Sequence, residues 1–436
     1  MRRFVICLIL VSCFLIGCGA SESAIPETLP TEPVATVCPT EATQPSTEPA
    51  TEPTELPVTE PPTEPVPEIV IPADPITEGI DIRLNDHPYA HRLTDDNIYS
   101  QLIFSGTTGP VISSETPFSS IYFKWDFVPN GYTVQWESGN IRAGAHGFLH
   151  EYIELPEPVT KVELVFDSEA EKRLCDVFLF TEGVAPAFVQ LWEPPCAQAD
   201  ILVFPTHSDD ETLFFGPLIA YYTLERELNV QTAFMVNHRY DLHRGHERLD
   251  ALWALGMRLY PILGDAPDYA GTDLGETLYF YRYSPIFEWQ VEQIRRFQPQ
   301  VVVGHDINGE YGNGGHKVNT HYLIQAIEAA ADPEQEPETA ERYGVWDTPK
   351  FYLHLYKENQ IILDVNTAIS ADPEQRSAFR IAEDAFEFHR SQMHLPYRVR
   401  QGSEWWVYDS TLFGLYRTLV GADTGNDMME HILPRQ

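Results

Sequence analysis

Short apolar runs alternate with longer amphipathic segments between residues 197 and 436. Unbroken apolar runs are typical of strands that are buried in a parallel sheet. The pattern predicts strands over 200–205, 231–237, 258–263, 299–304 and 350–356. Between and after them it predicts helices over 212–228, 244–256, 288–297, 319–331 and 375–392. This alternation indicates an α/β fold, with a Rossmann-like three-layer sandwich.

Two segments of this region interrupt the alternation. Residues 331–341 are acidic and contain prolines, so we expect them to form a loop. Residues 405–416 are rich in aromatic side chains. We expect these side chains either to pack against the domain or to line its pocket, and packing is their commoner use.

Residues 68–196 show a period of two residues instead. Stretches such as 120–125, 132–136 and 161–166 alternate apolar and polar residues, and Gly, Pro, Asn and Asp separate them. This pattern predicts an all-β sandwich domain that precedes the α/β domain of residues 197–436. It is weakly similar to galactose-binding-like jelly rolls. Its Tyr and Trp side chains can stack on sugars, although packing in the core is commoner.

The first residues have the pattern of an export signal. Arg2 and Arg3 precede a short apolar stretch, residues 4–16, which is too short for a typical membrane-spanning helix. Residues 1–18 resemble a bacterial lipoprotein signal with Cys18 as the lipidation site. The alternative is an ordinary signal that contains a chance cysteine. We therefore expect an extracytoplasmic protein that acyl chains anchor to the bacterial cell membrane.

Residues 19–67 have the composition of a disordered tether. Thr-Glu-Pro recurs along them, and no Lys or Arg lies between Arg3 and Arg83. Such a segment cannot bury enough apolar surface to fold, and its prolines and like charges favour an extended spacer. The whole chain carries a formal net charge of −37. This charge argues against nucleic acid and anionic membrane surfaces as partners, because binding to either needs basic patches.

The chain contains 6 cysteines, of which Cys7 and Cys13 leave with the signal. A disulfide between Cys175 and Cys196 is allowed outside the cytoplasm, and two separate thiols are equally consistent with the sequence. No cysteine pair in the sequence has the spacing of a zinc site.

Residues that can carry chemistry follow two of the predicted strands. After the apolar run 201–204 come His207, Asp209 and Asp210, at the point where open α/β sheets bind ligands. A His and an Asp there can hold a metal, while the other Asp is available as a base. The plainer alternative is a polar turn whose carboxylates cap the next helix. A second cluster, residues 304–317, also follows an apolar run, and the two strand ends can converge on one crevice.

The ordered motifs resemble those of the LmbE/PIG-L family of zinc-dependent N-deacetylases. The family's Pro-His-Pro-Asp-Asp-Glu motif corresponds to residues 206–211, and its Gly-x-Tyr-Gly-His-x-x-His motif corresponds to residues 309–316. Residues 244–256 are similar to the family's Arg-x-x-Glu-x-x-x-Ala-x-x-x-Leu-Gly helix. The late Asp-Val and His-x-Ser-Gln signatures are similar to residues 364–365 and 389–392.

The resemblance implies roles for individual residues. It implies three ligands for Zn²⁺, which are His207, Asp210 and His316. It implies that Asp209 is the general base, that Tyr311 polarises the substrate carbonyl, and that Arg244 lies near the sugar. These roles agree with the chemistry of a zinc site that keeps an open position for water.

Two positions depart from the family pattern. Ser208 replaces the usual proline, which only loosens a turn. Asn313 replaces a histidine that assists the transition state or the leaving group, and an amide cannot exchange a proton at neutral pH. Either Asp209 serves as both base and acid, or His305 or His321 substitutes, or activity is weak.

Other histidines have weaker functional interpretations. His238, His243 and His246 follow a predicted strand at what can be the rim of the crevice, and His246 is a candidate for substrate binding. Histidines in solvated loops are commoner than such contacts. His389 either points into the site or caps the end of its helix. Residues 306–317 are not a calcium loop, because they lack Gly at the sixth position and Glu at the twelfth.

These observations predict a zinc-dependent hydrolase that removes an N-acetyl group from an amino sugar or glycoconjugate at the cell surface. The alternative is a glycan-binding lipoprotein with a catalytically impaired deacetylase-like domain. Asn313 favours this alternative, and the intact set of ligand and base residues argues against it. A third possibility keeps the metal and hydrolyses another amide or an ester.

Overall fold

A computed structural model of the chain describes residues 71–127, 131–239, 241–402 and 408–433. The predicted signal, with Cys18, the tether and residues 405–407 of the aromatic segment lie outside the described residues. Residues 68–436 form one compact unit. The two domain boundaries predicted within and before this unit stay predictions. None of the described helices is long and apolar enough to cross a membrane.

The first sheet of the described chain is antiparallel in all its pairings. Its main path has the order β1-β9-β5-β8-β6-β7, while β2 pairs with β3 and β5, and β4 pairs with β9. A short helix, α1, spans Ala90–Leu93. The strands are β1 Pro75–Ile76, β2 Ile80–Leu84, β3 His87–Pro88, β4 Leu102–Phe104, β5 Thr108–Phe127, β6 Tyr132–Gln135, β7 Asn140–Ala143, β8 His150–Phe166 and β9 Lys172–Phe180.

The second sheet has the order β12-β11-β10-β13-β14-β16-β15. Its first five strands in this order are parallel, and β16 is antiparallel to both β14 and β15. The strands are β10 Ile201–Val203, β11 Val230–Val236, β12 Ile262–Ala266, β13 Val301–Gly304, β14 Lys350–His354, β15 Gln360–Ile362 and β16 Leu412–Thr418. Helices and strands alternate along residues 201–354, so the predicted α/β fold is confirmed.

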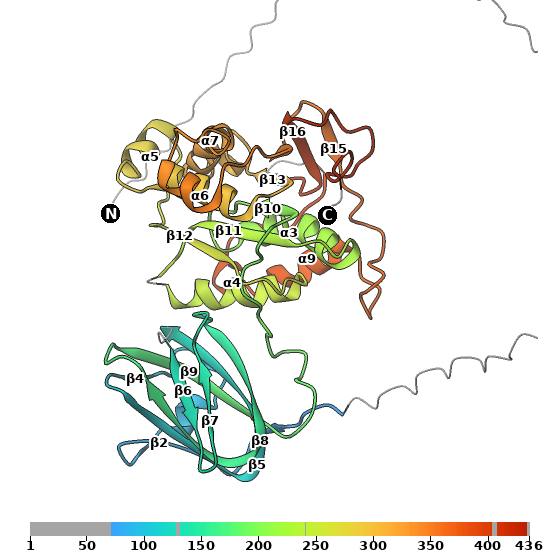
Figure 1. The fold of residues 1–436 in the computed structure, drawn as a ribbon. Helices are drawn as coiled ribbons and strands as arrows, with labels where there is room; N and C mark the ends of the chain where they lie inside the picture. Colours follow the sequence, from blue (N-terminus) through green and yellow to red (C-terminus); the bar gives the residue numbers. More distant parts are fainter. Residues whose placement is uncertain (1–70, 128–130, 240, 403–407, 434–436) are drawn as a thin grey trace, which may run out of the picture. The chain divides into compact units, whose positions relative to one another are not determined.

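Helices lie on both sides of the second sheet (Figure 1). Helices α5, α6 and α7 pack together on one side, and α3 and α4 both pack against α9 on the other. Alternate residues of β10 show how the sheet is buried: Ile201 and Val203 join one apolar cluster, while Leu202 joins another. The helices are α2 Asp210–Leu213, α3 Gly216–Ala220, α4 Leu242–Ala254, α5 Leu274–Phe280, α6 Ile286–Phe297, α7 Gly314–Ala329, α8 Pro337–Tyr343 and α9 Ala378–Phe386.

Several predicted elements differ from the observed ones. The single helix predicted over 212–228 is divided into α2, α3 and a π-helical turn, with Pro217 in the first turn of α3. The strand predicted over 258–263 lies at 262–266 instead, and the helix predicted over 375–392 ends at Phe386. Element ends are decided by local hydrogen bonding, which hydrophobic periodicity does not report.

The loop predicted over 331–341 is wrong in its second half, where α8 begins. Proline is well suited to the first helical position, because its missing N–H needs no partner there. The buried guanidinium of Arg295 also organises the approach to α8. It donates hydrogen bonds to five backbone carbonyl groups, those of Ala329, Ala330, Asp332, Gln335 and Glu336.

The disulfide between Cys175 and Cys196 that the sequence allows is not formed. The thiol of Cys175 is buried in β9 and takes part in no disulfide. Burial raises the pKa of the Cys175 thiol well above its usual value, which keeps the thiol protonated.

Candidate metal centre

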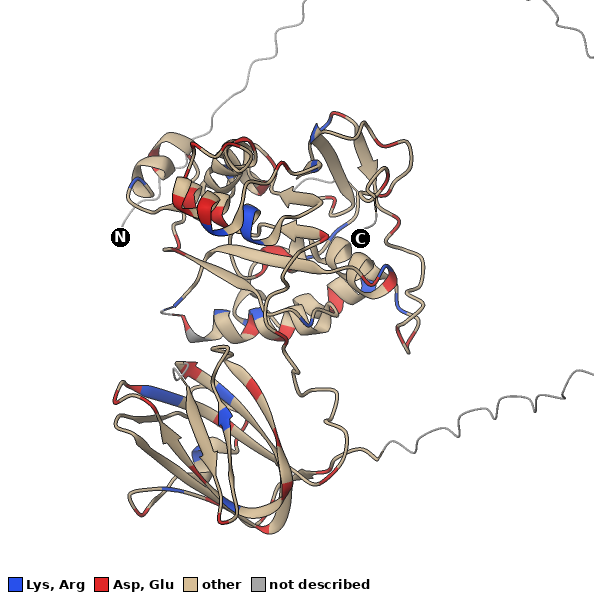
Figure 2. Cartoon of the chain, viewed as in Figure 1, with Lys and Arg blue, Asp and Glu red and all other residues tan. Residues whose placement is uncertain are grey.

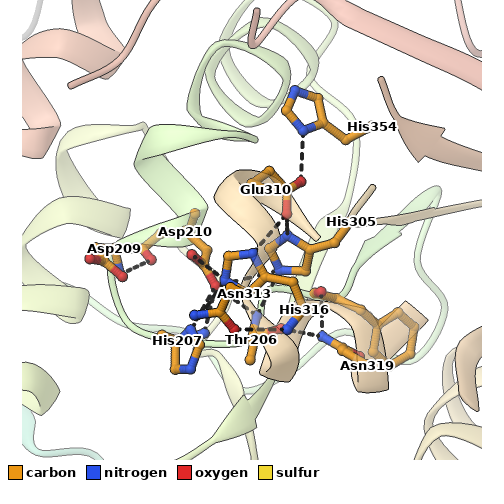
Figure 3. A network of polar contacts seen from close by, with 12 residues as sticks. Thr206, His207, Asp209, Asp210, His305, Glu310, Asn313, His316, Asn319 and His354 are labelled. Carbon is orange, nitrogen blue, oxygen red and sulfur yellow. Dashed lines mark hydrogen bonds and ion pairs between the residues drawn. The ribbon is translucent and has the colours of Figure 1, made fainter. Parts of the chain in front are cut away.

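Two loops that are distant in the sequence meet at the carboxyl ends of adjacent parallel strands. Val203 of β10 is in register with Val303 of β13, so the segments that follow both strands start from the same edge of the sheet. The first segment leads to His207 and Asp210, and the second leads to His316 in the first turn of α7. The predicted convergence of these strand ends on one site is therefore observed (Figure 3).

His207, Asp210 and His316 bring three buried ligand atoms within 4.8 Å of one another. His207 Nδ1 lies 3.3 Å from His316 Nε2. The same His316 nitrogen lies 3.3 Å from Asp210 Oδ1. A tetrahedral ion with bonds of ~2.0–2.1 Å separates its ligand atoms by about 3.3–3.4 Å. The spacing of the donor atoms thus fits a zinc ion.

The hydrogen bonding of Asp210 supports this fit. Its Oδ2 atom accepts hydrogen bonds from the backbone N–H groups of Thr206, at 3.1 Å, and His207, at 2.7 Å. Its Oδ1 atom is buried and has no hydrogen-bond partner among the described residues. Buried carboxylate oxygens are rarely left without a partner, because the loss of hydration is costly. A bound cation would satisfy this oxygen.

Glu310 is a second buried carboxylate beside the ligands, which the sequence analysis did not single out. It lies against the imidazole nitrogens of three histidines: Nδ1 of His316 at 2.7 Å, Nδ1 of His305 at 2.8 Å and Nδ1 of His354 at 2.7 Å. Burial opposes ionisation of Glu310, but His305 and the hydrogen bonds of all three rings hold its pKa well below the usual range. The ionised carboxylate fixes the His316 ring so that Nε2 faces Asp210.

Asp209 lies beside the ligand group, and two neighbours hold its side chain and its backbone. Arg244 donates to Asp209 Oδ1 at 3.1 Å and also bonds the backbone carbonyl of Ser208. The backbone N–H of Asp209 donates to Glu211 at 2.7 Å. Glu211 itself pairs with buried His389 at 2.6 Å, so His389 supports the loop. Burial raises the pKa of Asp209 to about 6, against the opposing effect of Arg244.

The backbone of Asp209 is strained, with φ at 136°. Non-glycine residues avoid this region of φ, and such conformations persist where surrounding contacts hold them. Here the hydrogen bonds to Glu211 and Arg244 supply those contacts. The strained conformation occurs where two adjacent carboxylates have different partners: Asp209 is held by Arg244, and Asp210 belongs to the ligand group.

Tyr311 and Asn313 lie on the loop between β13 and α7. The Tyr311 ring stacks on Tyr397 at 4.6 Å and meets the ring of His316 at 5.4 Å. Burial raises the pKa of Tyr311 far above its usual value, and the charges of Asp210 and Asp209 act in the same direction. The phenol therefore keeps its proton and can donate a hydrogen bond. Asn313 caps α7, accepting from the backbone N–H of His316 at 3.2 Å.

The histidines considered as substitutes for the missing family histidine are placed differently. His305 is buried, and its Nε2 accepts from the backbone N–H of Thr206 at 3.0 Å. His321 is exposed on α7 and has no hydrogen bond to the ligand group in the described part of the chain. The structure thus brings His305, and not His321, next to the ligands.

Two of the remaining histidines, one before α4 and one within it, make different contacts. His238 accepts from the backbone N–H of Ser208 at 3.3 Å, and it lies 3.7 Å from Asp268. His246 is buried, with its Nδ1 atom 2.7 Å from His150 of the first sheet. Within the described ranges, no hydrogen bond, ion pair or ring contact joins His246 to the metal ligands, so its predicted role at the substrate stays a prediction.

Known proteins offer partial matches to this chain, and no family model matches it. A 1D-myo-inositol 2-acetamido-2-deoxy-alpha-D-glucopyranoside deacetylase of Catenulispora acidiphila is 28% identical over 184 residues, which cover 36% of this chain and 56% of that protein. A protein of the same name from Nocardia farcinica is 32% identical over 181 residues, covering 36% and 57%. The chain therefore spans little more than half the length of these relatives.

Among solved structures, the N,N'-diacetylchitobiose deacetylase of Pyrococcus horikoshii aligns with a TM-score of 0.34 and 16% identity. The alignment covers 46% of this chain and 73% of that chain.

Proposed function

We propose that this chain is a zinc-dependent N-deacetylase of amino sugars. Its motifs resemble those of the LmbE/PIG-L deacetylases. The predicted resemblance is confirmed by the curated relatives, whose names state a deacetylase activity on an acetamido sugar. The observation that carries the proposal is the buried group His207, Asp210 and His316, in which Asp210 Oδ1 has no hydrogen-bond partner among the described residues. The base candidate Asp209 lies beside it.

The side chains can divide the work of amide hydrolysis as follows. The chemistry that zinc supplies when bound is Lewis acidity towards water and a carbonyl. Asp209, held by Arg244, takes up the proton of the attacking water. Tyr311, which keeps its proton, donates a hydrogen bond to the carbonyl oxygen as negative charge develops there. Asn313 cannot exchange a proton, so we assign the return of the proton to the leaving amine to Asp209 as well.

The proposal extends to the architecture and the location of the protein. Helices on both faces of a largely parallel sheet support a Rossmann-like three-layer domain, and the antiparallel sheet of residues 75–180 supports a β-sandwich accessory domain. The pattern of residues 1–18 and the Thr-Glu-Pro repeats support a lipid anchor at Cys18 and a tether. A surface-anchored enzyme would meet N-acetylated wall, host or dietary glycans.

The direct test compares metal content and acetate release. The purified protein is expected to bind about one zinc ion per chain and to release acetate from N,N'-diacetylchitobiose or another N-acetylated amino sugar. Asp209→Asn should keep the zinc and lose activity by a factor of roughly 10²–10⁴. His316→Ala should lose the zinc.

His321→Ala is the matched control, because His321 is an exposed histidine of the same helix. It should keep both metal and activity. A protein that binds no zinc, or an Asp209→Asn variant that works at the full rate, would refute the proposed mechanism.

A further inference from the structure

A second cavity lies beside α4, outside the metal centre. Its volume is about 1360 Å³, and its lining comes from the first sheet, from the segments around residues 96–99 and 187–190, from α4, and from α9 with its flanking residues. The lining includes none of the three metal-binding side chains His207, Asp210 and His316. Pockets for drug-sized ligands occupy roughly 300–1,000 Å³. This cavity therefore has room for an extended small molecule.

Helix α4 separates the cavity from the metal centre. His243, His246 and Asp250 follow one another at helical spacing and line the cavity. Arg244 and Arg248 lie on another face, where they bond Asp209 and the Ser208 hydroxyl. Acidic and basic residues alternate along α4 (Figure 2), and the arginines contact the loop of the metal centre while Asp250 lines the cavity.

A fixed chain of hydrogen bonds ends at the cavity. Gln190 donates from Nε2 to Asp250 at 2.6 Å, and its Oε1 accepts from the Trp192 indole at 2.8 Å. An indole N–H can only donate, so the orientation of the Gln190 amide is determined. Its Oε1 lies 2.7 Å from His150 Nδ1, which must therefore carry a proton. In the neutral ring, His150 Nε2 is then an acceptor.

The proton on His150 Nδ1 determines the tautomer of His246. Its Nδ1 lies 2.7 Å from His150 Nε2 and must donate to it. The other nitrogen of His246, Nε2, is then an acceptor, and it is buried without a hydrogen-bond partner among the described residues. Burial lowers the pKa of His246 to about 3 and that of His150 well below its usual range, so both rings are neutral. His246 lines the cavity, is 3% exposed, and thus carries an unfilled hydrogen-bond acceptor.

The charge of the lining favours a cation. Five carboxylates line the cavity against the three cationic groups Lys124, Arg376 and Arg390; the carboxylates are Asp96, Glu247, Asp250, Asp384 and Glu387. Lys124 is paired with Asp96 at 2.9 Å. Asp384 is paired with Arg376 at 3.3 Å and with Arg380 at 2.6 Å. Among the charged lining groups, Glu247, Asp250 and Glu387 then remain against Arg390. Negative charge therefore remains available to a ligand.

Aromatic rings complete the lining. Phe188 is 50% exposed and Phe388 is 38% exposed, and both border the cavity. Such rings offer apolar faces to a sugar ring and a negative π-face to an ammonium group. A few fixed polar groups among aromatic side chains are typical of a small-molecule site.

We infer that this cavity is a second ligand site, which binds a saccharide that carries a free amino group. The ammonium group would meet Asp250 and its neighbouring carboxylates, a hydroxyl group would donate to His246 Nε2, and the sugar ring would lie against the exposed phenylalanines. A sugar of this kind is the product that the proposed deacetylation releases, and to that extent the inference rests on the proposed function.

The test is a calorimetric titration of the full chain with glucosamine and, separately, with N-acetylglucosamine at pH 7. Glucosamine should bind at least tenfold more tightly, because acetylation removes the positive charge. Treatment with a chelator should leave glucosamine binding unchanged, since the cavity contains none of the metal ligands. Equal affinities for the two sugars, no binding of either, or loss of binding with the chelator would overturn the inference.

Two variants locate the site. Asp250→Asn keeps an oxygen for the Gln190 hydrogen bond and should weaken glucosamine binding at least tenfold. Glu387→Gln changes an exposed residue that cannot endanger folding, and it should weaken binding severalfold. Glu292→Gln, on α6 and outside the lining, is the control. Unchanged affinity in both cavity variants would place the ligand elsewhere. Asp250-dependent binding without any acetate release would keep this site and refute the proposed function.

Discussion

Glu310 is a buried residue that orients one ligand of the proposed metal centre. It contacts three histidines, one of which, His316, belongs to the proposed zinc-ligand set. Partners of this kind fix the tautomer and the direction of a ligating ring. Glu310 lies within the second motif, and His354 ends a buried strand. In a single sequence, nothing distinguishes Glu310 or His354 from an ordinary polar residue.

Replacing Glu310 by Gln tests this role. The amide keeps the shape of the side chain but cannot accept from all the rings, so the His316 ring loses part of its orientation. We expect the affinity for zinc to fall by a factor of roughly 10–100. The measurement is a zinc titration in competition with a chromogenic chelator. Glu328→Gln, an exposed position on α7, is the control, and equal zinc affinity in Glu310→Gln would contradict the assigned role.

Elements explain why motifs that are far apart in the sequence meet. The in-register parallel pairing of β10 and β13 brings the two polar loops to one edge.

A strand can also bury a carboxylate without a hydrogen-bond partner, as β9 does within the described residues. Asp176 of β9 is fully buried, and neither of its carboxylate oxygens has a hydrogen-bond partner within the described residues. Burial raises its pKa to about 7, against the lowering effect of Lys124.

Asp176 should therefore make the stability of the fold depend on pH. Between about pH 4 and pH 7 the folded state retains a proton that the unfolded state has lost, so the free energy of unfolding falls as the pH rises. Displacement of the pKa from 3.8 to about 7 corresponds to roughly 4 kcal/mol. Asp176→Asn should be more stable than the wild type at pH 8, and this advantage should shrink towards pH 4.

Denaturant unfolding at a series of pH values measures this difference. Glu154→Gln, at an exposed position of β8, should show no such trend. An effect of Asp176→Asn that is the same at every pH would rule out the raised pKa as its cause.

At the scale of the whole molecule, residues 71–433 are joined by aromatic contacts between distant segments. Phe148 stacks on Tyr260 at 4.6 Å, and the backbone N–H of Leu149 donates to the Tyr260 hydroxyl at 3.1 Å. Trp192 meets the same tyrosine at 5.5 Å. Tyr260 is thus one of the side chains that couple the residues before the second sheet to the α/β region, together with the His150–His246 and Gln190–Asp250 contacts, and this coupling favours a single cooperative unfolding transition.

Tyr260→Ala should weaken this coupling. We expect a loss of roughly 2–3 kcal/mol in the free energy of unfolding, below the range for a fully buried aromatic residue because Tyr260 is only partly buried. Calorimetry should show a broadened or divided transition. Tyr279→Ala, at a tyrosine that is 68% exposed, should leave one sharp transition. An unchanged transition in Tyr260→Ala would show that the coupling lies elsewhere.

The sequence by itself determined the α/β alternation, the two polar strand ends and the ordered motifs, because these are local patterns of apolar spacing and residue type. His207, Asp210 and His316 could be named from such patterns before their contacts were known. Only the tertiary structure decided what surrounds them. The support of His316 by Glu310 and the placing of His246 at a second cavity depend on contacts between residues far apart in the chain. Burial and hydrogen-bond direction arise from packing in three dimensions, and one sequence carries no local record of them.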